Sequence, residues 1–191
     1  MIREGWLGRF YEDFEIGDVY RHALGRTISE TDNTWFTLLT MNTNQMHFNA
    51  QYSSQSEFGK LLVNSTLTLA IVVGMSVSDI SQNAVANLGW DDIKLLHPVF
   101  VGDTLWAESQ VIDKRESKSR PDGGIVQVQT RGLNQHGDIC ITYRRTVLVH
   151  RKSAKSLTQA FPEPASEFEI VPTRDLGMTK NPPATTTPAT T

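Results

Sequence analysis

The chain has 191 residues, of which 39% are hydrophobic and 20% charged, and its formal net charge is −3. This balance is typical of a globular protein, argues against a disordered or membrane-spanning chain, and offers no basic face of the kind that nucleic acids require. The most apolar stretch, 61–77, is interrupted by polar residues and is too polar to cross a membrane. We expect no signal peptide, because no apolar run follows the N-terminus.

The single cysteine, Cys140, can form no intrachain disulfide and no cysteine-built metal site, which fits a cytoplasmic location. The composition changes near Lys152, after which proline and threonine dominate. Such a segment cannot bury enough apolar surface to pack a core. We therefore predict one folded domain over residues 5–153 and a flexible C-terminal extension over residues 154–191.

The first predicted elements are a strand over 19–28 and a helix over about 29–41. The helix prediction rests on the sequence Ser-Glu-Thr-Asp at 29–32, which has the form of a capping box and precedes an apolar run. A polar, irregular stretch then occupies 42–49, and a short helix is expected over 51–58.

The next predicted element is a long apolar helix that begins at Asn64 or Ser65 and runs to about Ile80. It is apolar almost all round, as a helix that is buried on most sides should be. This helix is the only predicted element that could occupy the centre of the domain.

After this helix the hydrophobic period changes to two, which is typical of strands. Strands are expected over 84–95, 104–113, 124–134 and 139–149. A long helix followed by antiparallel strands predicts an α+β hot-dog fold, in which a curved sheet wraps its apolar face around a central helix. Such a sheet has exposed edges, and pairing two of them predicts a homodimer or a higher homo-oligomer.

The segment 41–49 carries the strongest chemical signal, because it places His47 just after a polar loop that leaves a helix. A lone histidine is more often structural than catalytic, by about two to one. The segment nevertheless resembles the signature of the MaoC-like (R)-specific enoyl-CoA hydratases, which reads Asp, any residue, Asn, Pro, an apolar residue, His, any residue, Asp. The matching positions are Asn44, Met46 and His47, and the departures are Asn42, Gln45 and Asn49.

The resemblance covers about residues 10–150, since 97–105 resembles the family's Pro-Val-x-x-Gly-Asp-Thr-Leu segment and 134–137 its late hairpin. It implies a hot-dog fold and the hydration or dehydration of an acyl-CoA thioester, with coenzyme A as part of the substrate and no other cofactor. It also implies a catalytic group and a thioester-binding helix start. The catalytic group comprises His47, Asn42 and Asn44, and the helix start comprises Asn64 and Ser65.

The resemblance also implies the roles in this group, and the chemistry of the residues fits them. His47 is the expected acid and base, because an imidazole takes up and releases protons near neutral pH. The start of the long helix can stabilise the negative charge on the thioester oxygen through free backbone N–H groups. The Asn64 side-chain amide adds a further donor there.

Asn42 stands where the family has an aspartate, and an amide cannot accept a proton as a base. No carboxylate occurs between Asp32 and Glu57 to replace it. Three accounts remain open. His47 acts alone while Asn42 orients the water; a carboxylate such as Asp79 reaches in from another element; or the protein binds acyl-CoA without hydrating it. The first account is favoured, because His47 and Asn44 are in place.

The basic run at 115–120 is most simply a solvated hairpin end. In an acyl-CoA enzyme its side chains can instead bind the phosphates of coenzyme A or a substrate carboxylate. The candidates are Arg115, Lys118 and Arg120. This run, together with 86–90, resembles the itaconyl-CoA and mesaconyl-CoA hydratase branch of the family, whose substrates are short, branched and carry a second carboxylate.

The remaining histidines and tryptophans are predicted to be structural, with His22 and His150 peripheral, and Cys140 is predicted to be buried and inert. No spacing of residues predicts a metal site. Two alternatives to a hydratase stay open at this point. The first is a hot-dog module that binds an acyl-CoA without turnover, and the second is an acyl-CoA thioesterase.

Overall fold

The computed structural model describes residues 3, 5–154, 162 and 164–167. The chain separates into two units, residues 1–156 and 157–191. The predicted flexible extension over 154–191 lies almost entirely outside the described residues. Among those residues, no helix is long and apolar enough to cross a membrane.

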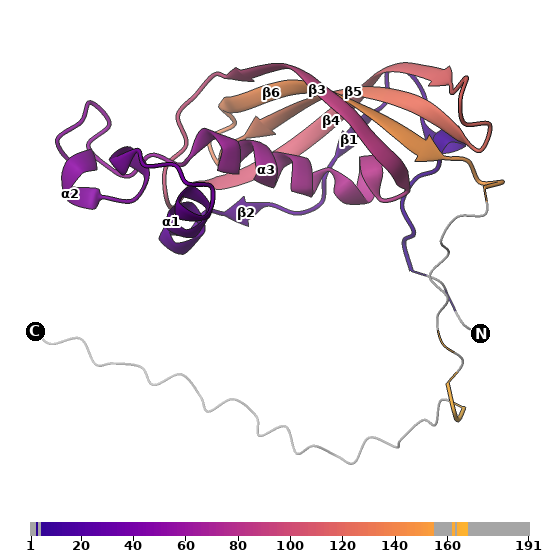
Figure 1. Cartoon of the computed structure of the whole chain (residues 1–191), viewed down its shortest axis with the longest axis horizontal. Helices are drawn as coiled ribbons and strands as arrows, with labels where there is room; N and C mark the ends of the chain where they lie inside the picture. Colours follow the sequence, from indigo (N-terminus) through magenta and orange to yellow (C-terminus); the bar gives the residue numbers. More distant parts are fainter. Residues whose placement is uncertain (1–2, 4, 155–161, 163, 168–191) are drawn as a thin grey trace, which may run out of the picture. The chain divides into compact units, whose positions relative to one another are not determined.

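The folded unit contains one long helix and six strands (Figure 1). The first half of the chain is built mainly from helices and short strands, and the second half is a meander of long strands. In chain order the elements are η1 (Tyr11–Asp13), β1 (Val19–Arg21), β2 (Arg26–Thr27), α1 (Glu30–Leu39), η2 (Gln45–His47), α2 (Ala50–Ser53), α3 (Ser65–Met75), the π-helical turn η3 (Val77–Ser81), β3 (Ala84–Leu95), β4 (Thr104–Glu116), β5 (Gly123–Leu133) and β6 (Ile139–His150).

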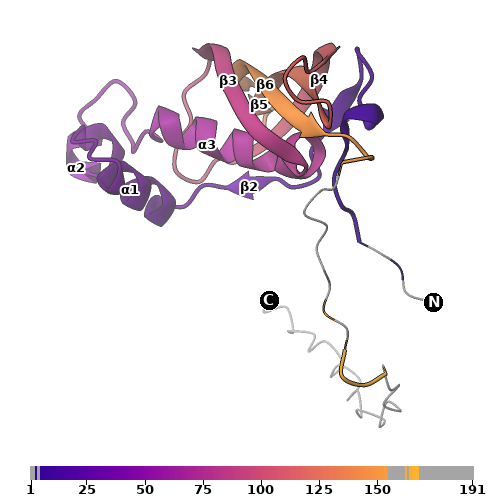
Figure 2. The ribbon, with the colours of Figure 1, turned by 45° about the vertical axis from the view of Figure 1, so that its right-hand side comes forward.

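The strands form one antiparallel sheet in the order β1-β4-β5-β6-β3, and β2 pairs with β4 beside this path. The sheet curves over α3, while α1 and α2 lie together at the N-terminal end of α3 (Figures 1 and 2). This arrangement confirms the predicted α+β hot-dog fold. It also brings the polar 42–49 segment to the end of the sheet where α3 begins.

The core side of the sheet holds two apolar clusters with a polar belt between them. One cluster surrounds α3 and includes Leu105 and Tyr143, and the other lies under η1 and includes Val126. The side chains between them are buried but polar, because β4, β5 and β6 each place one polar residue on this face; those of β4 and β5 are directly paired, and that of β6 lies two residues further along the sheet. These residues are Ser109, Thr130 and Arg145, which are 1%, 0% and 6% exposed.

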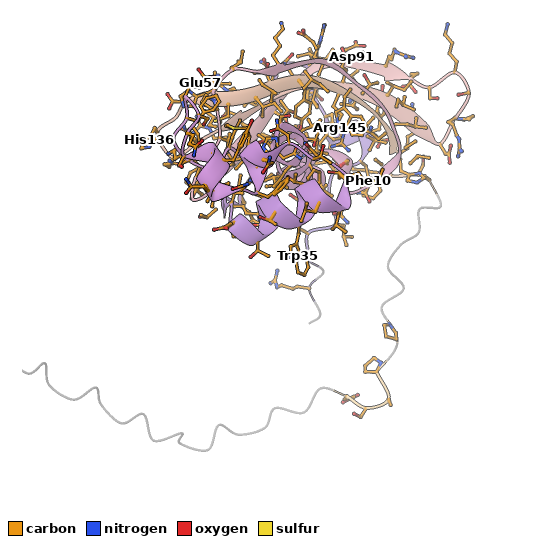
Figure 3. The ribbon with its side chains drawn as sticks, turned by 60° about the vertical axis from the view of Figure 1, so that its left-hand side comes forward. Phe10, Trp35, Glu57, Asp91, His136 and Arg145 are labelled. Carbon is orange, nitrogen blue, oxygen red and sulfur yellow. The ribbon has the colours of Figure 1, made fainter. Side chains whose placement is uncertain are left out.

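The polar belt is internally bonded, as buried polar groups must be. Ser109 Oγ and Thr130 Oγ1 lie 2.8 Å apart, and Arg145 donates to Ser76 Oγ at 3.2 Å and to Asn87 Oδ1 at 2.6 Å. Arg145 therefore links β6 to the end of α3 and to β3. It lies beneath the sheet on its helix side (Figure 3).

Three boundaries differ from the predictions. The predicted strand over 19–28 is two short strands, because the chain turns inward at His22, whose side chain bonds within the core. The helix expected over 51–58 ends at Ser53, where serine hydroxyls bond to nearby backbone carbonyls and compete with the helix. The long helix stops at Met75 and continues only as the π-helical turn.

α3 is also less enclosed than its composition predicts. Its buried side chains are Leu67, Thr68, Ile71 and Val72, all on the side that faces the sheet. On the opposite side, Thr66, Ala70 and Gly74 are exposed. The sheet therefore curves over one face of this helix and leaves the opposite face exposed.

α1 has its polar and apolar faces reversed relative to an ordinary surface helix. Asn33 and Thr37, one turn apart, are fully buried. Trp35, Leu38 and Leu39 are exposed, at 68%, 54% and 80% (Figure 3 shows Trp35 on the outer side of the helix). Trp35 is therefore not a core residue, and α1 is held to the domain by the polar contacts of Asn33 and Thr37 together with Phe36, which packs against the apolar cluster around α3.

β3 is an edge strand of the sheet and carries exposed apolar side chains, including Leu88, Trp90 and Ile93. Its pairing with β6 shifts register at three places, between Ala84 and Ala86, between Asn87 and Gly89, and between Asp91 and Lys94. The strand is therefore bent along its length.

Candidate functional site

The segment that carries the candidate histidine is shaped by asparagine side chains. Asn42 Oδ1 accepts from the Asn44 N–H at 3.0 Å, and Asn44 Oδ1 accepts from the Met46 N–H at 3.1 Å. Each is an asparagine turn that fixes the backbone two residues ahead. The two turns lead directly into η2, on which His47 lies. Asn42 Oδ1 has a second lone pair, so both this oxygen and the amide N–H groups can still contact a water.

His47 is buried, at 8% exposure, and one of its ring nitrogens is already bonded. Its Nδ1 lies 2.9 Å from the carbonyl oxygen of Leu62. A carbonyl oxygen only accepts, so Nδ1 must carry the proton in this contact. In the neutral ring Nε2 is then unprotonated and can accept a proton. This is the state that a general base requires.

The start of α3 lies next to this histidine, since Leu62 precedes the helix by three residues. Asn64 is the N-cap, and its Oδ1 accepts from the Thr66 N–H at 3.0 Å. Its Nδ2 donates to Thr37 Oγ1 at 3.2 Å, and the residue is 2% exposed. The side-chain amide predicted to bind the thioester thus caps the helix and anchors α1. The expectation of a substrate donor at this position is not met.

Ser65, by contrast, lies at the surface beside a pocket. It is exposed, and its N–H has no acceptor among the residues that the structure describes. It also borders a pocket of about 230 Å³ between the start of α3 and the segment that joins β3 to β4. Leu62, Leu96 and Val99 supply apolar walls of this pocket. His47 adjoins the pocket through Leu62 and does not itself line it.

A larger hollow, of about 770 Å³, lies on the sheet and is bordered by Arg21, Glu108 and Arg131. Both arginines already pair with the Glu108 carboxylate. No predicted site residue borders this hollow. We therefore place the candidate site at the smaller pocket beside His47.

Asp79 does not replace the missing family aspartate within this chain. It lies on η3, at the C-terminal end of α3, whereas His47 lies near the N-terminal end. Its carboxylate accepts from Arg9 at 2.6 Å and lies 2.8 Å from His22 Nδ1. His22 is 4% exposed, so the prediction that it is peripheral is wrong. Among the described residues, no carboxylate is hydrogen-bonded to His47.

The basic residues Arg115, Lys118 and Arg120 lie at or beyond the far end of β4 from the pocket. Eleven residue steps separate Thr104, near the pocket, from Arg115. At about 3.3 Å per residue this is roughly 36 Å along the strand. The structure therefore does not bring these side chains to the pocket of their own chain.

Cys140 borders the pocket but is fully buried, as predicted. Burial raises the pKa of its thiol to about 11, with a smaller contribution from the carboxylates of Asp103 and Asp138. The thiol therefore stays protonated at neutral pH and is a poor nucleophile. In the described part of the chain, no group of three or more His, Cys, Asp or Glu side chains is placed to hold a metal ion.

Two buried residues of this site were not identified from the sequence. Asn33 and Thr37 point from α1 toward the His47 loop and the start of α3. A helical spacing of four between polar residues was the available signal. The neighbouring Trp35, Leu38 and Leu39 concealed it, because apolar residues were expected to mark the inner face.

Comparisons with known proteins agree with this architecture. The chain is 37% identical over 158 residues to a mesaconyl-CoA hydratase from Cereibacter sphaeroides, covering 83% of this chain and 44% of the relative. It is 35% identical over 147 residues to a β-methylmalyl-CoA dehydratase from Chloroflexus aurantiacus, covering 76% of this chain and 41% of the relative. The structure of a MaoC-like dehydratase from Rhodospirillum rubrum superposes with a TM-score of 0.68 at 28% identity, covering 77% of this chain and all of that one.

The curved sheet, the long helix and the histidine loop at its start place the chain in the MaoC-like class of hot-dog proteins. Within that class it belongs to the mesaconyl-CoA hydratase family, whose family model matches residues 3–167. The chain spans less than half the length of these two curated relatives.

Proposed function

We propose that this protein is an enoyl-CoA hydratase, adding water across the 2,3-double bond of an acyl-CoA thioester and catalysing the reverse dehydration. The observation that carries the proposal is the state of His47. Its Nδ1 donates to the Leu62 carbonyl, and its Nε2 is free to accept a proton beside a pocket. A general base needs this combination of restraint and an unprotonated nitrogen.

In the proposed reaction, Nε2 of His47 takes a proton from a water molecule as the water oxygen bonds to the β-carbon. The double-bond electrons move toward the thioester, which becomes an enolate, and the Ser65 N–H at the start of α3 donates to its oxygen. The same Nε2–H then protonates the α-carbon. Because one group serves both proton transfers, the hydroxyl and the proton are added to the same face of the double bond.

The substrate is proposed to be a branched C5 dicarboxylic thioester, mesaconyl-CoA or itaconyl-CoA. Relatives named mesaconyl-CoA hydratase and β-methylmalyl-CoA dehydratase support this choice. The size of the pocket supports it too. At about 230 Å³, the pocket is smaller than the roughly 300–1,000 Å³ of sites for drug-sized ligands, and so suits a short acyl group.

Assembly, compartment and cofactor use complete the proposal. A homodimer is supported by the exposed edge strand β3 with its apolar side chains, which is a liability unless paired. A cytoplasmic location is supported by the single reduced, buried cysteine. The proposed chemistry needs only a base and hydrogen-bond donors, so coenzyme A enters solely as part of the substrate.

A non-catalytic acyl-CoA-binding module is the second candidate, and one observation favours it. The side-chain oxygens of Asn42 and Asn44 both accept from backbone N–H groups inside the loop. Neither amide can take a proton from water, and His47 has no carboxylate partner among the described residues.

The test is to incubate the protein with crotonyl-, longer-chain enoyl-, itaconyl- and mesaconyl-CoA and to follow the products by mass. Addition of one water, fastest with a C5 dicarboxylic substrate, is the expected result. Hydration of crotonyl-CoA alone would keep the reaction and remove the substrate assignment. Binding of every thioester without added water would establish the binding module. Release of free coenzyme A would identify a thioesterase.

A further inference from the structure

Asn33 is a fully buried amide on the inner face of α1, and it bonds to three separate backbone segments around the candidate site. Its Nδ2 donates to the carbonyl of His47 at 2.7 Å and to the carbonyl of Leu62 at 3.0 Å. Its Oδ1 accepts from the N–H of Asn64 at 2.9 Å. One side chain thus joins the histidine loop, the segment that follows it, and the N-cap of α3.

The orientation of this amide is determined by its partners. Two carbonyl oxygens can only accept and one backbone N–H can only donate. A flipped amide would place its oxygen against both carbonyls and its NH₂ group against the N–H of Asn64, so it would lose all three bonds. Only one orientation of the Asn33 amide makes all three hydrogen bonds. The side chain therefore holds the three backbone segments in fixed positions relative to one another.

The Leu62 carbonyl connects the Asn33 amide to the imidazole of His47. The carbonyl oxygen accepts two hydrogen bonds, one from His47 Nδ1 at 2.9 Å and one from Asn33 Nδ2 at 3.0 Å. Asn33 therefore fixes the acceptor that keeps the proton on Nδ1, and it also fixes the backbone of His47 itself. A shift of either would release the ring from the state in which Nε2 is unprotonated.

We propose that Asn33 is a positioning residue that holds His47 in its Nδ1-protonated tautomer, with Nε2 aimed for proton transfer. Its importance for turnover rests on the proposed hydratase function, whereas its effect on the tautomer does not. Partners that fix the tautomer of a metal-binding histidine typically contribute about 10- to 100-fold to affinity or activity, and we expect an effect of similar size from Asn33 on turnover. Asn33 has this role although it never touches the substrate.

Two substitutions at this position separate its donor and acceptor contacts. Asn33→Asp keeps an oxygen that can accept from the Asn64 N–H and loses the NH₂ donor to both carbonyls. Asn33→Ala removes all three contacts. The matched control is Thr130→Val, which removes an equally buried polar group from the distant polar belt, where it bonds to Ser109.

The first readout is independent of activity. In protein labelled with ¹⁵N-histidine, long-range ¹H–¹⁵N correlation distinguishes the protonated ring nitrogen from the unprotonated one, and a His47→Gln spectrum assigns the signal. At a pH where the ring is neutral, the wild type and Thr130→Val are expected to show the proton on Nδ1. Both Asn33 variants are expected to show a mixture of the two tautomers.

The second readout is turnover of mesaconyl-CoA. We expect kcat to fall about 10- to 100-fold in the Asn33 variants with KM within about threefold, and kcat of Thr130→Val to stay within about twofold. An unchanged tautomer in either folded Asn33 variant would overturn the proposal, as would a changed tautomer with unchanged kcat. If the wild type hydrates no enoyl-CoA, the proposed function fails, and the tautomer alone decides whether Asn33 sets the state of His47.

Discussion

The two ends of α3 each hold a buried histidine, and the two rings are used differently. At the N-terminal end, His47 bonds through Nδ1 to a backbone carbonyl, and Nε2 has no partner among the described residues. At the C-terminal end, His22 lies 2.8 Å from Asp79 through Nδ1 and 2.9 Å from Ser109 Oγ through Nε2. The two histidines are similarly buried. They differ in that His22 uses both ring nitrogens in hydrogen bonds, whereas His47, beside the pocket, uses only one.

The order of the partners at the C-terminal end is that of a serine–histidine–carboxylate triad, yet Ser109 is 1% exposed and bonded to Thr130. A nucleophile needs access to a substrate as well as a base. This arrangement is therefore part of the internal polar belt. The comparison shows that side chains arranged as in a catalytic triad can take part in catalysis only where they face a pocket that a substrate can enter.

The largest effect is expected from His47→Gln. This change removes the proposed proton acceptor, so hydration of mesaconyl-CoA should fall about 100- to 10,000-fold in kcat. Binding of the thioester, measured by calorimetry, should remain within about threefold. Unchanged turnover in this variant would show that His47 is not the base. The proposed functional difference between His47 and His22 would then be wrong.

His22→Ala should act on stability instead of turnover. It leaves the Asp79 carboxylate and the Ser109 hydroxyl without their ring partner in a buried environment. The free energy of unfolding in urea should therefore fall by about 2–4 kcal/mol. The milder control, Ser109→Ala, should cost about 1 kcal/mol. A selective loss of kcat without a loss of stability would show that the distant histidine belongs to the reaction.

The pH dependence of stability should report the carboxylate at the same end. Burial alone would raise the pKa of Asp79, but hydrogen bonds from His22 and Arg9 outweigh it and hold that pKa below its ordinary value. A lowered pKa contributes stability that is present above the unfolded value near 3.9 and is lost as the pH falls through the folded value.

Asp79→Asn should therefore lower stability by about 1–2 kcal/mol at pH 7 and flatten the loss of stability below about pH 4. Urea midpoints measured between pH 3 and pH 7 test this. The matched control is Asp91→Asn, at an exposed position where the described residues show no ion pair. Equal acid sensitivity of the two variants would contradict the assignment.

The smallest effect is expected from the double substitution of Arg115 and Arg120 by glutamine. These side chains lie at the far end of the sheet from the pocket, so KM for mesaconyl-CoA should change by less than about twofold. A rise of more than about tenfold in KM would instead assign them to a thioester bound at the pocket of another chain.

The long elements were predictable because their signals are local. The alternation in β4, β5 and β6 marks the face that packs on α3, and the capping residue Asn64 marks where that helix begins. His47 was also identifiable, through its sequence neighbours. These features depend on residues within a few positions of one another.

The contacts that define the state of the site were not predictable in the same way. His22 and Asp79 are 57 residues apart, and Asn33 and Asn64 are 31 apart. The polarity of a residue does not predict which group, distant in the sequence, will be its hydrogen-bond partner. α1 was the hardest case, because its fully buried residues, Asn33 and Thr37, are polar while most of its apolar residues are exposed.

The three register shifts of β3 affect how readily the edge of the sheet can aggregate with other chains. A straight strand of an unfolded or foreign chain can match only a few consecutive N–H and C=O groups on so bent an edge. Runaway edge-to-edge aggregation needs long uninterrupted runs of such groups. The distortions of β3 thus select against stacking into fibrils by chains whose apolar edge is not yet paired in the proposed homodimer.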